Sequence, residues 1–140
     1  VSIYNNKIYC GSDDKNLYCL DTAGKLLWSK NLNSKIISSQ GFYGNNVIVS
    51  GVNGFIFSLD ENTGAENWKF ETKGAVYASP LIKDNKIFIG SYDFNIYCLD
   101  AEDGAELWRY KTEGRIRSSA VVWKDYILVG SDPKYFYCFK

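Results

Sequence analysis

The sequence contains no histidine and no methionine, and it has only 2 prolines among its 140 residues. The absence of histidine excludes histidine-dependent catalytic triads, histidine general bases and imidazole metal ligands. The absence of methionine means that the sequence starts without an initiator, as expected for a processed chain or an excised piece. No apolar run approaches the roughly 18 residues that a membrane-spanning helix needs.

Neither sign of charge is in excess, because 16 Lys and Arg balance 16 Asp and Glu. A dedicated nucleic-acid-binding protein usually shows a clear basic excess, so we expect no nucleic-acid partner. The 4 cysteines include no CxxC pair, so zinc-finger and thioredoxin-like spacings are also missing. Aromatic residues, by contrast, are abundant at 16% of the chain, which is not the composition of a disordered protein.

An internal repeat of about 40 residues dominates the sequence. The repeated text reads NLYCLDTAGKLLW, FIFSLDENTGAENW, NIYCLDAEDGAELW and a truncated YFYCFK. The aligned units differ by insertions or deletions of one residue, which we place at residues 22–23 and 52–54. These lie in predicted turns, where such changes are best tolerated. We expect the units to cover residues 1–34, 35–74, 75–114 and 115–140 of a single domain portion. The repeated positions are Trp28, Trp68 and Trp108, then Gly24, Gly64 and Gly104, then Asp21, Asp60 and Asp100.

Each unit is predicted to form four short β-strands, which we call A to D. β-branched and aromatic residues fill these runs, Gly, Asn and Asp separate them, and no stretch keeps a helical period. A four-stranded unit of about 40 residues in tandem repeat is typical of a β-propeller. We therefore predict an all-β propeller of four-stranded antiparallel blades; a β-solenoid is the alternative, but its repeats are usually shorter. In the third unit the strands are expected at Val76–Ile82, Lys86–Gly90, Asn95–Leu99 and Glu106–Lys111.

The sequence holds about three and a half such units. With the units aligned at Gly11, Gly51, Gly90 and Gly130, it begins partway through a strand A and ends with strand C of the fourth unit. Because folded proteins avoid open strand edges, we expect half of a seven- or eight-bladed ring. The remaining blades of the same polypeptide, or a second copy, would be needed to close it.

These repeats resemble the pyrroloquinoline-quinone-type propeller repeat, which is shared by quinoprotein dehydrogenases and by a non-catalytic outer-membrane assembly lipoprotein. The family's tryptophan-docking motif reads A-x-D-x-x-T-G-x-x-x-W. The second unit matches it with Ser58, Asp60, Thr63, Gly64 and Trp68, and the first and third units keep its Asp, Gly and Trp. The resemblance implies an extracytoplasmic location, although no signal peptide is visible in this segment. It also implies that the repeated Trp, Asp and Gly are structural docking residues.

Cysteine fills the small first position of this motif at Cys19, Cys98 and Cys138, where a free thiol serves as a small hydrophobe. Because equivalent positions on different blades lie apart, we expect free thiols and not a metal site or a disulfide framework. Cys10, placed across a hairpin from Leu17, leaves one alternative open, a diagonal bridge to Cys19. The repeated Asp residues occupy the same position in every unit, which favours a role in turn formation over acid–base chemistry.

The resemblance further implies pyrroloquinoline quinone and calcium, which the dehydrogenases hold with adjacent cysteines, a Trp platform and carboxylates. No adjacent cysteines occur here, and no Asp or Glu departs from the repeat pattern in a way that suggests a calcium site. Trp123, the only Trp outside the docking position, is interpreted as a surface or rim aromatic, with a stacking platform as the alternative. We therefore assign no catalytic, cofactor or metal residue and expect no enzyme. The expected function is a non-catalytic scaffold or binding module for protein or peptide partners; the alternatives are part of a quinone-dependent dehydrogenase, or an axial small-ligand or carbohydrate binder.

The predicted turns divide the charges between the two ends of the blades. Acidic residues dominate the A–B and C–D turns, whereas basic residues dominate the end formed by the B–C turns and D–A links. One explanation of this division is turn chemistry, since Asp and Glu suit the C–D turn. The alternative is a functional one, a basic end that attracts acidic partners by electrostatic steering. The basic end also carries aromatic and arginine side chains, the usual anchors of protein interfaces. The predicted binding face consists of Tyr92, Phe94, Arg115, Arg117 and Tyr135.

Overall fold

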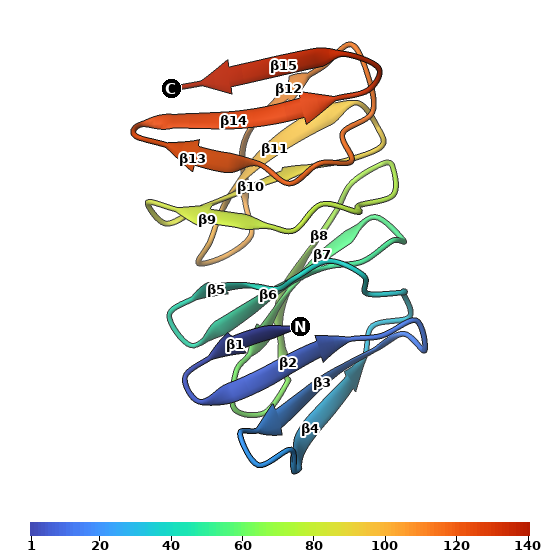
Figure 1. Ribbon diagram of the computed structural model, residues 1–140, viewed down its shortest axis with the longest axis vertical. Coiled ribbons are helices and arrows are strands. Elements are labelled where there is room, and N and C mark those ends of the chain that lie inside the picture. Colours follow the sequence, from blue (N-terminus) through green and yellow to red (C-terminus); the bar gives the residue numbers. More distant parts are fainter.

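A computed structural model describes all 140 residues and contains strands and turns but no helix. Its fifteen strands form four separate antiparallel sheets, three of them four-stranded and one three-stranded. Figure 1 shows these sheets stacked in chain order along the longest axis of the molecule. Each sheet is one blade, and the four blades do not close into a ring.

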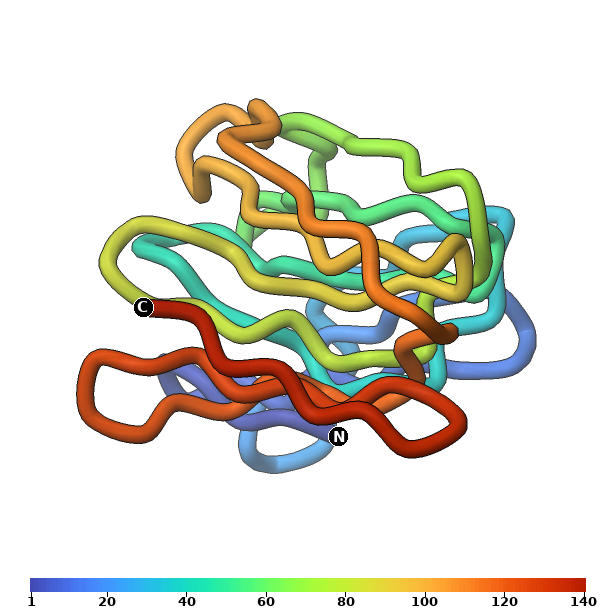
Figure 2. The backbone as a smooth tube through the Cα atoms, turned by 90° about the horizontal axis from the view of Figure 1, so that it is seen from above, coloured from blue at the N-terminus to red at the C-terminus, as the bar shows by residue number.

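Sequential strands are neighbours in every blade, so each connection within a blade is a hairpin. In Figure 2 the fourth strands of blades 2 and 3 lie along the upper edge of the view, away from the N-terminus. Blade 1 consists of β1 (Ser2–Tyr4), β2 (Lys7–Gly11), β3 (Asn16–Asp21) and β4 (Leu26–Asn31). Blade 2 consists of β5 (Gly41–Tyr43), β6 (Asn46–Ser50), β7 (Phe55–Asp60) and β8 (Glu66–Glu71). Blade 3 consists of β9 (Leu81–Lys83), β10 (Lys86–Gly90), β11 (Asn95–Asp100) and β12 (Glu106–Lys111), and blade 4 of β13 (Val121–Trp123), β14 (Tyr126–Ser131) and β15 (Tyr135–Phe139).

The first strand of each blade is shorter than the sequence pattern predicted. In the third unit we expected a strand over Val76–Ile82, whereas β9 begins at Leu81 and residues 76–80 form an irregular link. In this link the N–H of Ser79 donates to Ser119 Oγ of the next link, at 2.8 Å, and not to the backbone of a neighbouring strand. β1 has three residues, as do the first strands of the other blades.

The repeat alignment also needs a correction at the second strand. Gly11 pairs with Leu17, and the corresponding position opposite Ile56 is occupied by Ser50 and not by Gly51. The turns between the second and third strands are therefore equally long in blades 1, 2 and 3. The one-residue difference between units lies only in the turn between the third and fourth strands, which is shorter in blade 1 than in blades 2 and 3.

Serine is compatible with this position in blade 2 because the neighbouring link residue is smaller there. A Cβ on Gly11 would overlap the side chain of Ile36. The corresponding link residue of the second unit is Val76. Ser50 also finds a partner for its hydroxyl, which donates to Ala78 O at 2.8 Å. The size of the link residue thus allows glycine to be replaced by serine in this blade.

The register of blade 1 decides between the two readings of its cysteines. Cys10 lies opposite Tyr18, not opposite Leu17, and Cys19 lies opposite Tyr9. Opposite residues of an antiparallel pair share a face, and successive residues alternate between faces. Cys10 and Cys19 therefore point to opposite faces of the sheet, so the alternative of a diagonal disulfide between them is wrong. All 4 cysteines are free in the structure.

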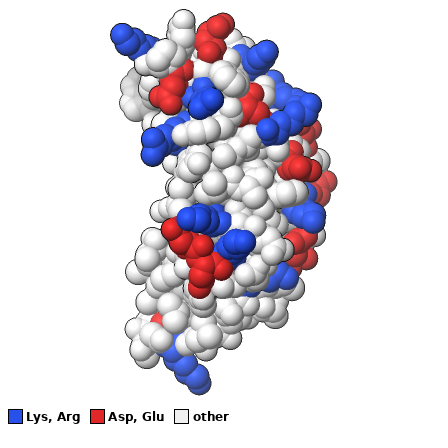
Figure 3. Space-filling model, turned by 90° about the vertical axis from the view of Figure 1, so that its right-hand side faces the viewer, with Lys and Arg blue, Asp and Glu red and all other residues white.

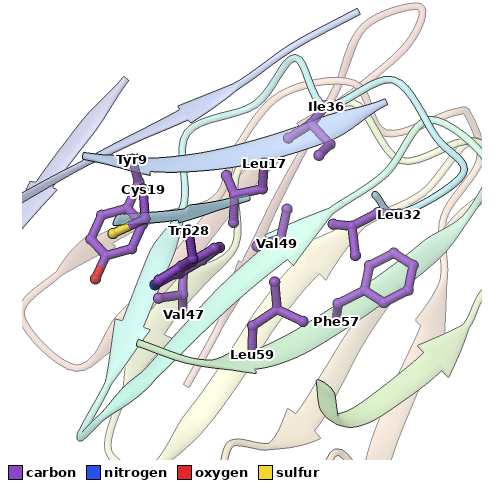
Figure 4. Close-up of a cluster of buried hydrophobic side chains, with 10 residues drawn as sticks. All are labelled: Tyr9, Leu17, Cys19, Trp28, Leu32, Ile36, Val47, Val49, Phe57 and Leu59. Atoms are coloured by element: carbon purple, nitrogen blue, oxygen red, sulfur yellow. The ribbon is translucent and has the colours of Figure 1, made fainter. Parts of the chain in front are cut away.

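The hydrophobic core lies between the blades, because strands of the inner blades are covered on both faces. Along β6, Val47 and Val49 pack toward blade 1 while Ile48 packs toward blade 3, as the alternation of strand side chains dictates. Three clusters result, one in each seam between neighbouring blades. Figure 4 shows the first seam, where side chains of blades 1 and 2 face each other. Its ten residues are Tyr9, Leu17, Cys19, Trp28, Leu32, Ile36, Val47, Val49, Phe57 and Leu59.

Candidate functional site

The repeated tryptophans pack against the repeated glycines of the following blade. A Cβ on Gly64 would lie 2.6 Å from Cε3 of Trp28, and a Cβ on Gly104 would lie 2.5 Å from Cε3 of Trp68. Both glycines also have positive φ angles, 71° and 74°, which side-chain-bearing residues rarely adopt. Trp28 in addition donates its Nε1–H to the backbone oxygen of Glu61 at 3.0 Å. Each of these indoles therefore ties one blade to the next.

Trp108 and Gly24 have no such glycine–indole contact. Trp108 packs instead on Phe88 and Phe139, with ring centroids 6.0 and 5.6 Å apart. Nothing lies within 4 Å of the place that a Cβ on Gly24 would occupy. Trp123, which stands outside the repeat, is 57% exposed.

The repeated aspartates lie in the turns that precede the fourth strands. Asp60 Oδ1 accepts hydrogen bonds from the N–H and the hydroxyl of Thr63, at 2.8 and 2.9 Å. The bond from this hydroxyl is the main reason why the pKa of Asp60 lies below its ordinary value. Asp21 and Asp100 accept backbone N–H bonds in the corresponding turns. These carboxylates are engaged in turn geometry, which is what short polar side chains commonly do at such positions.

The residues present do not fit the calcium and quinone that the dehydrogenase resemblance implies. No three Cys, Asp or Glu side chains converge in a geometry that could hold a metal ion. Calcium requires six or more oxygen ligands, and the repeated carboxylates are each turned into their own backbone. Burial raises the pKa of Cys98 to about 11, so its thiol stays protonated near neutral pH.

Two residues of the predicted binding face come together where the turns between second and third strands meet the links between blades. The guanidinium carbon of Arg115 lies 5.5 Å from the ring centroid of Tyr92, and the rings of Tyr92 and Tyr77 have centroids 4.6 Å apart. Sequence reasoning missed Tyr77. Tyr77 occupies in the second link the position that Arg117 occupies in the third. This equivalence to a residue of the predicted binding face could have identified Tyr77 from the sequence. Figure 3 looks onto this end of the blades and shows basic and acidic side chains interspersed on it.

The structure does not bring the whole predicted face into one contact group. Phe94 has a positive φ of 72° and is 39% exposed. Tyr135 is 51% exposed on β15, and its ring centroid lies 6.4 Å from that of Tyr137. Neither Phe94 nor Tyr135 shares an aromatic, cation–π or hydrogen-bond contact with Tyr92 or Arg115.

Asp93 anchors the turn that carries Tyr92 to the preceding link. Its carboxylate accepts hydrogen bonds from the backbone N–H of Lys73 at 2.9 Å, the N–H of Asn95 at 3.0 Å and the hydroxyl of Tyr97 at 2.6 Å. Burial raises the pKa of Asp93, but these hydrogen bonds, first that of Tyr97, outweigh burial and hold the pKa below its ordinary value. The folded chain therefore favours the ionised carboxylate.

Replacing Asp93 by asparagine is expected to destabilise the chain by roughly 1–2 kcal/mol near neutral pH, because the lost hydrogen bonds end on a partly solvated charge. Since the folded-state pKa is depressed, this stabilisation is fully present above the unfolded-state value of about 3.9 and is lost as pH falls through the folded-state value. Urea unfolding between about pH 7 and pH 2 measures it, and the two proteins should converge at the acid end. The matched control is Asp14→Asn in blade 1, whose carboxylate is exposed and has no bond to a link; equal losses in both variants would contradict the anchoring role.

Four antiparallel sheets that pack face to face in chain order, with a core in every seam, define this chain as a portion of a β-propeller. More narrowly, the chain belongs to the family of the outer membrane protein assembly factor BamB, whose family model matches residues 1–71. No curated protein sequence matches it significantly. The chain forms no long apolar helix of the kind that spans a lipid bilayer.

Solved structures extend the likeness to the whole chain. BamB from Moraxella catarrhalis is similar with a TM-score of 0.87 and 29% identity, over 96% of this chain and 42% of that one, so this chain spans less than half the length of that protein. The computationally designed Ika4 protein is similar with a TM-score of 0.87 and 18% identity, over 98% of this chain and 86% of that one. Quinohemoprotein alcohol dehydrogenase ADHIIG from Pseudomonas putida HK5 gives a TM-score of 0.80 and 19% identity, over 91% of this chain and 27% of that one. The last two likenesses bear on the fold alone.

Proposed function

We propose that this chain is part of a non-catalytic β-propeller that binds or scaffolds a protein or peptide partner. The observation that carries the proposal is the group of Tyr77, Tyr92 and Arg115 at the end of the blades, in which the Tyr92 ring packs on Tyr77 and also lies beside the Arg115 guanidinium. Tyr and Arg are the residue types that most often dominate binding energy at protein interfaces. The family supports a protein partner, since BamB is named as a protein assembly factor.

A comparison between blades supports a binding role for this group over a structural one. At the corresponding positions of blade 1, Lys35 Nζ lies 3.4 Å from Asp13 Oδ2 in an exposed ion pair. In blade 3 the cation is kept as Arg115, but the carboxylate is replaced by the ring of Tyr92. No carboxylate oxygen lies within 4.0 Å of the Arg115 guanidinium. The guanidinium donors are therefore available to a partner, and the ring restricts their orientation.

We also propose that further blades, or a second copy of this chain, cover the outer faces of blades 1 and 4 in the assembled propeller. The exposed apolar side chains on these two blades support this proposal, because the corresponding faces of the inner blades are buried in seams. A quinone-dependent dehydrogenase, the alternative function, is supported by likeness of fold alone.

The binding proposal is tested by selecting a random peptide library, displayed on phage, against the purified chain. We expect enriched peptides to bind saturably and to lose about tenfold or more in affinity for the double variant Tyr92→Ala/Arg115→Ala, as for the removal of interface anchors. The matched control is Asp13→Ala/Lys35→Ala, the corresponding pair of blade 1, which should leave the affinity unchanged. Failure to enrich any saturable binder, or equal losses in both double variants, would count against the proposal.

A further inference from the structure

A hollow of about 390 Å³ lies between the last link and the end of β14, at the same end of the blades as Tyr92 and Arg115. It contains no hydrophobic residue, in contrast to the apolar seams. The hollow is lined by Arg117, Ser118, Gly130, Ser131 and Asp132.

Ser131 is the unusual member of this lining. Its side chain is buried, with 8% exposed, and its hydroxyl has no hydrogen-bond partner. In blade 3 the corresponding Ser91 accepts a bond from the backbone N–H of Asp93 at 3.3 Å, and the same bond recurs in blade 1. Blade 4 has Pro133 at this place, and proline has no N–H to donate, so the Ser131 oxygen lacks this accepted bond. The bond that Ser91 Oγ donates to Gly74 O at 3.2 Å has no counterpart at Ser131 either, which leaves the Ser131 proton unpaired as well. Buried hydroxyls without a partner are rare and costly, so this one points to a group from outside the chain.

Arg117 supplies an unneutralised cation to the lining of the same hollow. It is exposed, and no carboxylate oxygen lies within 4.0 Å of its guanidinium, that of Asp132 included. The hydroxyl of Ser118 donates a hydrogen bond to Gly130 O at 2.8 Å. Ser131 therefore has the only hydroxyl of the lining whose proton is without an acceptor. The backbone N–H of Asp132 donates to the backbone oxygen of Arg115 at 2.9 Å and so joins the hollow to the Tyr92–Arg115 group.

We propose that this hollow binds a carboxylate of an acidic peptide, with Arg117 as its cation and the Ser131 hydroxyl as its second donor. The inference rests on the proposed binding function and names the chemistry of the partner. A guanidinium presents paired N–H donors that match the two oxygens of a carboxylate. Asp132, on the same lining, disfavours a doubly charged phosphate more strongly than a singly charged carboxylate.

The test compares two fluorescein-labelled peptides of equal length, hexaglutamate and hexaglutamine, by fluorescence anisotropy at low salt. Hexaglutamate is expected to bind about tenfold or more tightly than hexaglutamine, and to weaken as salt is raised. Equal affinities for the two peptides would overturn the carboxylate site. That outcome leaves the peptide selection described above unaffected, so the failure of this inference and the failure of the proposed function are distinguishable.

Two variants then separate this hollow from general charge attraction. Arg117→Gln should weaken hexaglutamate binding by about tenfold or more, whereas Arg109→Gln, on β12 and paired with Glu106, should not. Ser131→Ala should also weaken binding by about tenfold, yet leave the melting temperature unchanged or higher, because the hydroxyl has no partner in the free chain. Equal losses for both arginine variants, or a Ser131→Ala variant that melts lower and binds as before, would overturn the proposal.

Discussion

Replacing Trp28 by alanine is expected to lower the free energy of unfolding by about 3–5 kcal/mol, as for other large aromatic side chains removed from a core. Trp28 is 9% exposed and belongs to the cluster that joins blades 1 and 2. Its loss would open a cavity against Gly64 and leave the backbone oxygen of Glu61 without its indole donor. Urea unfolding followed by circular dichroism, at equal protein concentrations, measures the change.

The control for this variant is Leu107→Ala, because Leu107 is 47% exposed on β12 and joins none of the three core clusters. It should lose less than about 1 kcal/mol, the usual range for surface substitutions. If Leu107→Ala proved as costly as Trp28→Ala, the indole would not be what holds these two blades together.

The 140 residues by themselves are expected to self-associate. Exposed apolar side chains lie on β1 in blade 1 and on β13 and β15 in blade 4, whereas the second and third strands of blades 2 and 3 are buried on both faces. Apolar patches of this kind favour association because their burial removes them from water. Light scattering should therefore give a mass of at least twice 15.9 kDa at micromolar concentrations. The side chains concerned include Ile3 at 71%, Val121 at 55%, Trp123 at 57% and Phe136 at 70% exposure.

A charged substitution on one outer face distinguishes this association from non-specific aggregation. Phe136→Asp, on β15, should shift the chain toward the monomer, because a carboxylate would have to be desolvated in the contact. Leu107→Asp is the matched control, since Leu107 is also exposed but lies on the fourth strand of an inner blade. A wild-type chain that stays monomeric with a sharp cooperative melt would contradict the prediction.

The sequence predicted the all-β class and the blade repeat because alternation along the second and third strands is strong and recurs in every unit. It overextended the first strands for a physical reason. Val76 and Ala78 are both buried, so the link has the period-two pattern of a strand, although its side chains pack on the core without a strand partner. Similarly, the identity of Gly11 and Gly51 suggested an alignment that the register contradicts, because Ser50 holds the place of Gly11.

The candidate site was predicted only in part, because it depends on differences between units and not on what they share. Tyr92 and Arg115 were found from their residue types, and the structure brings them together. Tyr77 and Ser131 were missed, since Tyr77 becomes notable only beside the ring of Tyr92, and Ser131 only because the fold buries its hydroxyl without a hydrogen-bond partner. Contacts between a link and a turn far apart in sequence are set by tertiary packing, which no local pattern encodes.

The seams differ in chemistry, and this difference specifies the order of the blades. Tyr9, Ile48 and Phe88 hold the same place in β2, β6 and β10, yet each enters a different cluster with its own set of partners. A tandem array of identical units could dock its blades in any sequence and would be prone to misassembly between repeats. If blades 2 and 3 were exchanged, the ring of Tyr9 would face the side chains of blade 3 that now pack against Ile48. Because the units have diverged, the side chains on the two sides of each seam complement each other and not those of another seam. A variant in which the order of the blades is changed should therefore fold poorly, even though every blade is retained.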